Sequence, residues 1–259
     1  MRPVAWVVLA FLFAAPSSFR YASVQFTPVD SIAFDADGTV VALTSFKIDR
    51  PSVMAAINPV DSLVAQTQES GNVILIRPLP DDRCEVSAFL AATQQSLGLG
   101  KFAGKTTSSD AKRVAGECAT SKPEKMFDDE YEFHLTYDVP ITAIPKPSAL
   151  PAGGGEPGAQ YLALVKAIQS SDWSVAHLHT PEGALPDTRE KTLQSNYFEN
   201  LALNYPKSAT ITGGLVKGDR ARIELTGLHH DGHKVRGTVA MKKVGANWRV
   251  TDQAFFGME

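Results

Sequence analysis

Two carboxylates stand two residues apart in the segment SIAFDADGTVV (31–41), a spacing that can support phosphoryl transfer. Such a pair, here Asp35 and Asp37, can supply a nucleophile and a general acid/base. Attack by a carboxylate divides phosphoryl transfer into two easier steps, and a bound Mg²⁺ neutralises the phosphate oxygens. Gly38 and Thr39 would then shape the loop. The same residue types are also those that a tight turn between two strands requires.

The segment resembles the catalytic loop of haloacid-dehalogenase-type phosphatases, which present such a pair after an apolar strand. The resemblance implies that Asp35 is the nucleophile and Asp37 the general acid/base. That family also needs a strand ending in Ser or Thr, a lysine and a further acidic pair, all on a parallel α/β sheet. Here the apolar run GNVILIRPL contains Pro78 and carries no Ser or Thr at its end, and the acidic cluster FDDE (127–130) follows no apolar strand. The sequence therefore favours a β-hairpin with a DADG turn and keeps the phosphatase as an alternative.

The first residues predict export. Arg2 precedes the apolar run VAWVVLAFLFAA (4–15), and small residues follow it, in the order of a secretory signal peptide. A membrane span needs about 20 apolar residues, so this run is too short to be a permanent anchor. We therefore expect a signal peptide at 1–17, with cleavage near Ser17, and a periplasmic or secreted protein.

Charge and cysteine content narrow the function classes. The formal net charge is −3 and no Lys/Arg-rich run is present, so we expect no nucleic-acid partner. Cys84 and Cys118 form an even pair, which in an oxidising compartment most simply predicts one disulfide. Closing that loop would contribute about 3–4 kcal/mol in the chain-entropy model. Neither cysteine has a second one at metal-ligand spacing.

A Pro/Gly-rich segment, IPKPSALPAGGGEPGA (144–159), predicts a surface linker. We therefore expect a β-rich domain with one disulfide at 18–145, a linker at 146–159 and a second domain at 160–259. In the first domain the alternation of EYEFHLTYDVPI (130–141) predicts a half-buried strand. Two further predictions concern the residues before it: a helix over 82–100 and a loop over 101–129.

The second domain has helical spacing first and strand alternation afterwards. GAQYLALVKAIQSSDWSVAHLH (158–179) predicts a helix, and a second helix over 187–206 is opened by an Asp187 cap with Glu190 as its capping-box partner. Strands are then predicted in the segments ATITGGLVKG, RARIELTGLHH, KVRGTVAMKKV and NWRVTDQAFF. Asp231-Gly232 is typical of a two-residue hairpin turn.

The segments ITGGLVKGDRARIELTG and GTVAMKKVGANWRVTDQAF resemble the small NTF2-like (cystatin-like) domains of secreted bacterial proteins. The resemblance covers about 100 residues, from Gln160 to the C-terminus, and lies in turns and core positions. It implies an α+β fold with two helices packed on a curved antiparallel sheet. The N-terminal β-rich module is of uncharacterised type and less closely resembles the modules that accompany such domains.

The resemblance also implies a cone between sheet and helices that can bury a small ligand or form a catalytic pocket. The pocket residues we expect are nearly all apolar, which leaves both a plain core and a ligand cavity open: Tyr161, Val165, Trp173, Phe198, Met241 and Trp248. His230 and His233 flank the predicted turn and are weak candidates for metal ligands. His177 and His179 are interpreted as polar residues at a helix end. No cofactor is expected.

The function expected from the sequence is that of an exported, non-catalytic binding or protein-interaction module of the bacterial envelope. One alternative is a small-ligand carrier that uses the NTF2-like cone. The other is an Mg²⁺-dependent phosphatase acting through Asp35 and Asp37. Enzymatic activity is left open but is not favoured. The expected partner is a protein or a small apolar ligand, with no nucleic acid and no stable membrane anchor, and a homodimer is allowed.

Overall fold

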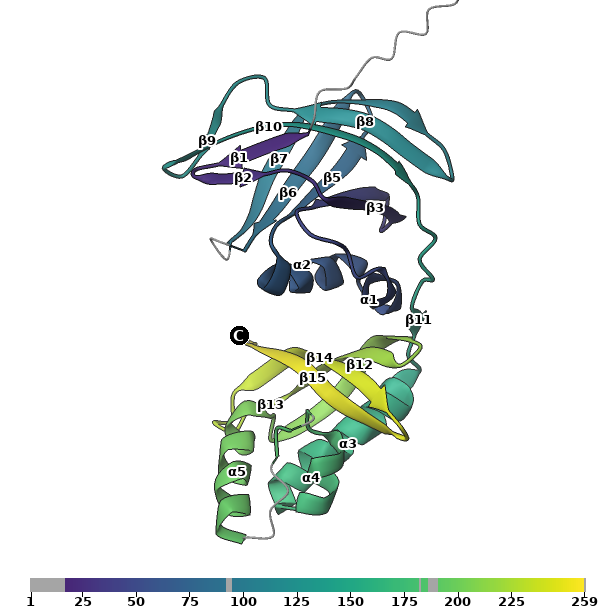
Figure 1. Ribbon diagram of the computed structural model, residues 1–259. Coiled ribbons are helices and arrows are strands. Elements are labelled where there is room, and N and C mark those ends of the chain that lie inside the picture. Colours follow the sequence, from purple (N-terminus) through teal and green to yellow (C-terminus); the bar gives the residue numbers. More distant parts are fainter. Residues whose placement is uncertain (1–16, 92–94, 182, 186–190, 259) are drawn as a thin grey trace, which may run out of the picture. The chain divides into compact units, whose positions relative to one another are not determined.

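The computed structural model describes residues 17–91, 95–181, 183–185 and 191–258. The chain divides into two compact units: unit 1 comprises Met1–Val53 and Pro59–Ile144, and unit 2 comprises Met54–Asn58 and Pro145–Glu259. The protein is 23% helical and 50% strand, which confirms a mixed α/β composition (Figure 1). No helix in the described ranges is long and apolar enough to cross a membrane.

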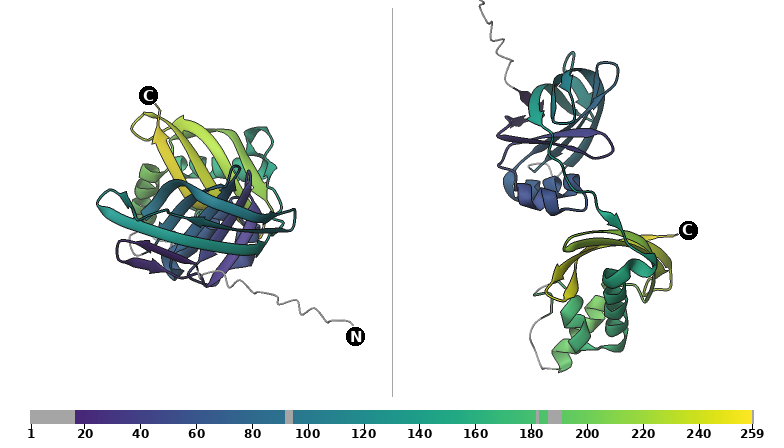
Figure 2. Two further views of the ribbon diagram at one scale, coloured as in Figure 1. Left: turned by 90° about the horizontal axis from the view of Figure 1, so that it is seen from above. Right: turned by 90° about the vertical axis from the view of Figure 1, so that its right-hand side faces the viewer.

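The strands of unit 1 form a strongly curled antiparallel sheet in the order β2-β1-β10-β8-β7-β6-β5-β4-β3, with β9 paired to β10 (Figures 1 and 2). The strands are β1 (Ser18–Tyr21), β2 (Val24–Phe26), β3 (Asp30–Asp35), β4 (Thr39–Thr44), β5 (Val73–Leu79), β6 (Arg83–Leu90), β7 (Gln95–Ser109), β8 (Arg113–Ala119), β9 (Glu124–Met126) and β10 (Asp129–Pro140). The curl brings β3 to the end of β10, where Ala33 bridges Ile141 and the Thr142 N–H donates to the Ala33 carbonyl.

Strands β3, β4 and β5 are buried on both faces. Val41 and Ile74 belong to a large apolar core on one face, which also contains an aromatic cluster from β1, β2 and β10. Val40 and Val73 face a smaller core on the other face, which Leu63 of α2 (Pro59–Ser70) and Val53 of α1 (Arg50–Ala55) cover. Burial on both faces explains why these segments are continuous apolar runs without alternation.

The DADG segment is the turn of a hairpin. β3 and β4 pair antiparallel, with Phe34 opposite Val40 and Asp35 opposite Thr39. Asp37 and Gly38 have positive φ angles of 53° and 112°, as a tight turn requires. The hairpin prediction is confirmed. The phosphatase alternative required a parallel sheet at Asp35 and is contradicted by this pairing.

The helix predicted over 82–100 and the loop predicted over 101–129 are both wrong. β6 and β7 occupy most of the first segment, and β7, β8 and β9 occupy much of the second. Cys84, Val86 and Leu90 alternate into the core at strand spacing, whereas the helix was predicted from the i, i+3, i+4 spacing of Val86, Phe89 and Leu90. The outer faces of β7 and β8 are polar, which hid their strand character.

Cys84 on β6 and Cys118 on β8 form the predicted disulfide, with their Cα atoms 6.0 Å apart. β7 pairs with both of these strands and therefore lies between them. Gly104 of β7 makes the crossing feasible, because a Cβ atom there would lie 2.8 Å from the Cys84 sulfur. The absence of a side chain at this position leaves room for the disulfide.

Unit 2 is an antiparallel sheet in the order β11-β12-β13-β14-β15, with helices on one face (Figures 1 and 2). Its elements are β11 (Ser148–Ala149), a 3-10 turn (Ala152–Gly154), α3 (Gly155–Ser170), α4 (Trp173–His179), α5 (Lys191–Asn204), β12 (Ser208–Lys217), β13 (Arg220–Leu228), β14 (Lys234–Val244) and β15 (Asn247–Gly257). The strands predicted from the sequence correspond to β12–β15.

Three local predictions for unit 2 need correction. The helix predicted over 158–179 is interrupted at Ser171, which has a φ of 55°, and the Asp172 carboxylate caps α4. The predicted linker 146–159 contains β11, the 3-10 turn and the start of α3. The connection between β13 and β14 runs from His229 to His233 and is longer than two residues.

The predicted cap at Asp187 and Glu190 lies outside the described residues, and α5 begins at Lys191.

Candidate functional site

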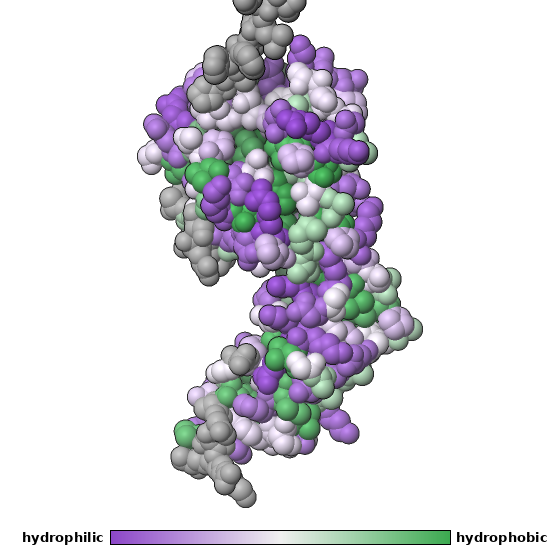
Figure 3. Space-filling view, turned by 45° about the vertical axis from the view of Figure 1, so that its right-hand side comes forward, coloured by the Kyte–Doolittle hydropathy of each residue, from purple (hydrophilic) through white to green (hydrophobic). Residues whose placement is uncertain are grey.

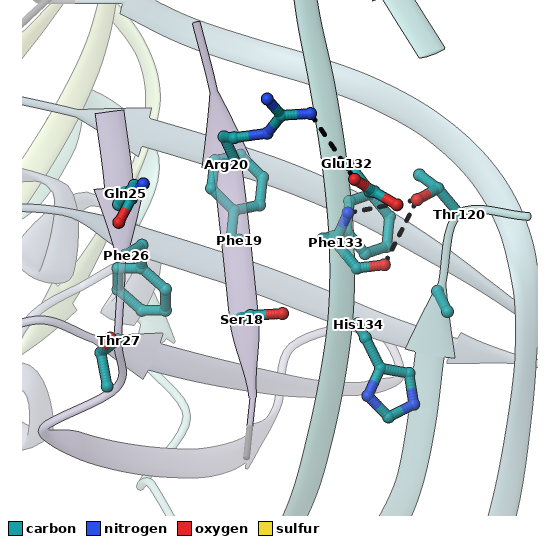
Figure 4. Close-up of a pocket in the computed structure, with 11 residues that line it drawn as sticks. Ser18, Phe19, Arg20, Gln25, Phe26, Thr27, Thr120, Glu132, Phe133 and His134 are labelled. Atoms are coloured by element: carbon teal, nitrogen blue, oxygen red, sulfur yellow. Dashed lines mark hydrogen bonds and ion pairs between the residues drawn. The ribbon is translucent and has the colours of Figure 1, made fainter. Parts of the chain in front are cut away.

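An open groove of about 410 Å³ lies over β1, β2 and β10 of unit 1 (Figure 4). The backbone of Phe19, Phe26 and Phe133, which pair across the strands, forms its floor. One wall carries the paired side chains of Gln25, Arg20 and Glu132, and the other carries Thr27, Ser18 and His134, with Thr120 at the end of β8. The groove is therefore built from strands that are far apart in the sequence.

The groove floor is fixed by aromatic packing on the opposite face of the sheet. The Phe19 ring stacks on Phe133 at a centroid distance of 6.1 Å and meets Phe26 edge-on at 6.4 Å. All three side chains are at most 2% exposed. Rearranging the floor would expose these rings, so the groove is preformed.

Charged side chains along the groove are partly neutralised by neighbours. Arg20 contacts Glu130 at 3.1 Å and Glu132 at 3.6 Å, and His134 lies 3.6 Å from Glu117. These side chains are 39–51% exposed, so their ion pairs are screened by water and contribute little to stability. They remain available as hydrogen-bond donors and acceptors for a polar guest.

The groove shows no catalytic pair in the described part of the chain. Ser18 and His134 are cross-strand partners, but no hydrogen bond joins their side chains among these residues. A nucleophilic serine needs such contact with its base.

A second depression of about 230 Å³ continues along β10, from Thr136 to Val139, beside Asp30 of β3. Ser17 closes one end, since its hydroxyl donates to the Thr136 carbonyl at 2.8 Å and accepts from the Thr136 N–H at 2.9 Å. The Asp30 carboxylate accepts two hydrogen bonds from Arg50, at 2.9 and 3.0 Å. These bonds hold the pKa of Asp30 well below its usual range.

The pocket residues predicted from the sequence lie together in the apolar core of unit 2. Tyr161, Val165, Phe198, Met241 and Trp248 are each at most 5% exposed. The sixth, Trp173, packs at the edge of this core, its ring edge-on to that of Phe198 at 5.7 Å. The structure thus brings these residues together, and neither depression described above includes them.

This core also contains polar groups whose hydrogen bonds were not predicted from the sequence. His179 is 6% exposed, and its Nδ1 lies 3.0 Å from the Trp248 carbonyl. The Trp248 N–H donates to Gln160 at 2.6 Å, so α3 and α4 both bind the start of β15. The hydroxyl of Tyr161 and the side-chain oxygen of Gln253 are buried without a hydrogen-bond partner in the described residues.

The histidines of the β13–β14 connection form a local cluster. The rings of His229 and His230 lie 4.1 Å apart, and His229 Nδ1 is 3.3 Å from the Asp231 carboxylate. The described residues contain no group of three or more His, Cys, Asp or Glu side chains that could hold a metal ion. Within the described residues, His230 and His233 are therefore not part of a three-residue metal-ligand group.

Comparisons with protein-family models, with curated proteins and with solved structures find no match to this chain. Any function must therefore be argued from the residues themselves.

Proposed function

We propose that the protein is an exported, non-catalytic binding protein that holds a polar partner in the groove over β1, β2 and β10. The observation that carries this proposal is the groove itself: an open, polar depression of about 410 Å³ over a backbone floor that aromatic rings support from the opposite face of the sheet. Its hydrogen-bonding groups suit an extended, polar segment of a partner protein. In Figure 3 hydrophilic and hydrophobic residues are interspersed over the visible face of unit 1, as at many non-obligate interfaces.

Export to the bacterial envelope is part of the proposal. The disulfide between Cys84 and Cys118 fits an extracellular or periplasmic protein, since thiols are kept reduced in the cytosol. The arrangement of α3, α4 and α5 on one face of a curved antiparallel sheet supports an NTF2-like assignment for unit 2. That assignment concerns the fold alone, and the proposed function rests on the groove in unit 1.

The experiment is site-specific photo-crosslinking in cells that export the protein. A photoreactive amino acid at Gln25, on the groove wall, should give an adduct of higher mass on irradiation. The same amino acid at Asp61, exposed on α2 of the same unit, is the matched control. An adduct at Gln25 that is absent at Asp61 supports the proposal. Equal yields at both positions, or no adduct at Gln25, would refute it.

A second candidate function is a carrier of a small neutral molecule inside unit 2. The buried oxygens of Tyr161 and Gln253 favour it, because unpartnered polar atoms in a core are destabilising unless a guest or water bonds to them. The Gln253 amide donates to the Asn204 carbonyl at 2.9 Å, and the ring of the next residue, Tyr205, stacks with Tyr161 at 6.4 Å. Burial raises the pKa of Tyr205 to about 12, so its hydroxyl stays neutral.

The effect of Tyr161→Phe on stability distinguishes a core without a guest from a core that holds one. If the hydroxyl is unpartnered, its removal should leave stability unchanged or raise it, by up to about 2 kcal/mol. If a guest bonds to the hydroxyl, the variant should be less stable. Native mass spectrometry should then show the additional mass of the guest on the unmodified protein but not on the variant. Stabilisation without any mass change would exclude the carrier function.

A further inference from the structure

Charge is distributed unevenly between the two faces of the unit 2 sheet. Directly paired residues share a face and successive residues alternate, so the register identifies the face opposite the helices. Ile223 of β13 is fully buried in the core beneath the helices, which places Arg222 and Glu224 on the other face. The pairing then extends this assignment to β12, β14 and β15.

Lysine and arginine side chains dominate this outer face, which we call the basic face. Its cationic residues in the described part of the chain are Lys217, Arg220, Arg222, Lys234, Arg236 and Lys242. Its carboxylates in the same part are Glu224 and Asp252, which gives a formal net charge of +4 against −3 for the whole chain. The flanking turns add Asp219 and Asp231 but leave the sign positive.

Three of these cations stand in a single cross-strand row: Lys217, Arg220 and Lys242. Like charges directly opposite one another destabilise a sheet. No ion pair relieves any of the six within the described residues. Lys217 donates to the Ala56 carbonyl at 2.8 Å, whereas Arg222, Lys234, Arg236 and Lys242 are exposed. The Arg249 guanidinium donates to the carbonyls of His177 and Thr180 at the end of α4, so it does not belong to this face.

Exposed apolar side chains accompany the cations at one end of this face. Leu228 is paired with Lys234, and Phe256 is paired with Arg236. The Met258 N–H donates to the Lys234 carbonyl, which continues the same row. Leu228, Phe256 and Met258 are 40%, 58% and 45% exposed, an unfavourable arrangement for side chains of this size in water.

We propose that this end of the basic face docks on a bilayer surface rich in anionic lipid. Lys234 and Arg236 would contact headgroup phosphates, while Phe256, Met258 and Leu228 enter the interfacial region. A soluble polyanion would use the cations but would leave the apolar side chains in water, which favours the bilayer as partner. The association is peripheral and independent of the groove in unit 1.

The test is sedimentation of the exported protein with vesicles of phosphatidylglycerol and phosphatidylcholine, compared with phosphatidylcholine alone. We expect binding to the anionic vesicles only. Each cation near an anionic surface strengthens binding about fivefold, so the double variant Lys234→Gln/Arg236→Gln should partition roughly 25-fold more weakly. Phe256→Ser keeps the charge and should also weaken binding.

The control variant Lys101→Gln/Lys105→Gln removes the same charge from exposed positions of β7 and should bind like the unmodified protein. Equal weakening by both double variants would show that vesicle binding depends on net charge alone, and would overturn the proposal. Binding to both vesicle types, or to neither, would also overturn it. Retention on soluble polyphosphate without sedimentation on vesicles would assign the basic face to a polymer instead. Circular dichroism confirms that each variant is folded.

Discussion

The Asp30–Arg50 pair offers a direct test of how α1 is held on the sheet of unit 1. The Asp30 carboxylate accepts both guanidinium hydrogen bonds and also the N–H groups of Ser31 and Ile48. Asp30→Asn removes the charge and one of the acceptor oxygens. Hydrogen bonds to charged groups contribute about 1.5–3 kcal/mol each, but the Arg50 side chain is 48% exposed, so solvent reduces its share.

We therefore expect Asp30→Asn to lower the free energy of unfolding of unit 1 by about 2 kcal/mol. For a unit of this size the loss corresponds to a fall in Tm of roughly 8 °C in scanning calorimetry. Asp37→Asn is the matched control. Asp37 is exposed in the β3–β4 turn with a φ of 53°, a conformation that asparagine also adopts.

The pH dependence of the stability difference tests whether the effect of Asp30→Asn is electrostatic. The pKa of Asp30 is lowered in the folded protein, so its contribution is fully present above the unfolded-state value of about 3.9 and is lost as the pH falls through the lower folded value. The stability difference between the unmodified protein and Asp30→Asn should thus be constant from about pH 5 to 7 and shrink below about pH 4. A difference that does not change across this range would refute the electrostatic explanation.

Three further predictions concern local features. Cys84→Ala/Cys118→Ala should lower the stability of unit 1 by about 3–4 kcal/mol, measured by denaturant unfolding, and equal stability of reduced and oxidised protein would contradict this. Phe127→Gly should leave Tm unchanged or raise it, since Phe127 has a φ of 57° and is 89% exposed; a clear loss would show that the ring makes contacts. Asp172→Ala removes the N-cap of α4 and should lower stability by about 1 kcal/mol in thermal unfolding. Ser174→Ala, two residues further along the chain, should lower stability less.

The fold was predictable from sequence where local chemistry decides it. Asp37-Gly38 supplies positive φ angles for a turn, and the alternating segments of unit 2 become β12–β15. The prediction failed for β6, because Val86, Phe89 and Leu90 stand at helical spacing, although Val86 and Leu90 face one core and Phe89 packs against the other. Polar long strands such as β7 are stabilised by distant neighbours, which a local pattern does not reveal.

The candidate sites were hidden for the same reason. The groove combines Arg20 with Glu132, and these residues become neighbours only when β1 pairs with β10. The basic face takes its cations from β12, β13 and β14, so no stretch of the sequence is rich in lysine and arginine. The buried cluster around Tyr161 was predicted, since helical and strand periodicity place those residues inward.

The pairing of β1 with β10 also constrains the order in which unit 1 can fold. Ser17 and Thr136, which hydrogen-bond to one another, are 119 residues apart, whereas β3 to β8 pair in chain order, each with the next strand. When a chain emerges N-terminus first, β3 to β8 can pair as each strand appears, but β1 can pair with β10 only after β10 has emerged. During that interval Phe19 and Phe26 have no partner ring on β10. The groove over β1, β2 and β10 therefore forms only in the last step of assembly, when unit 1 is complete.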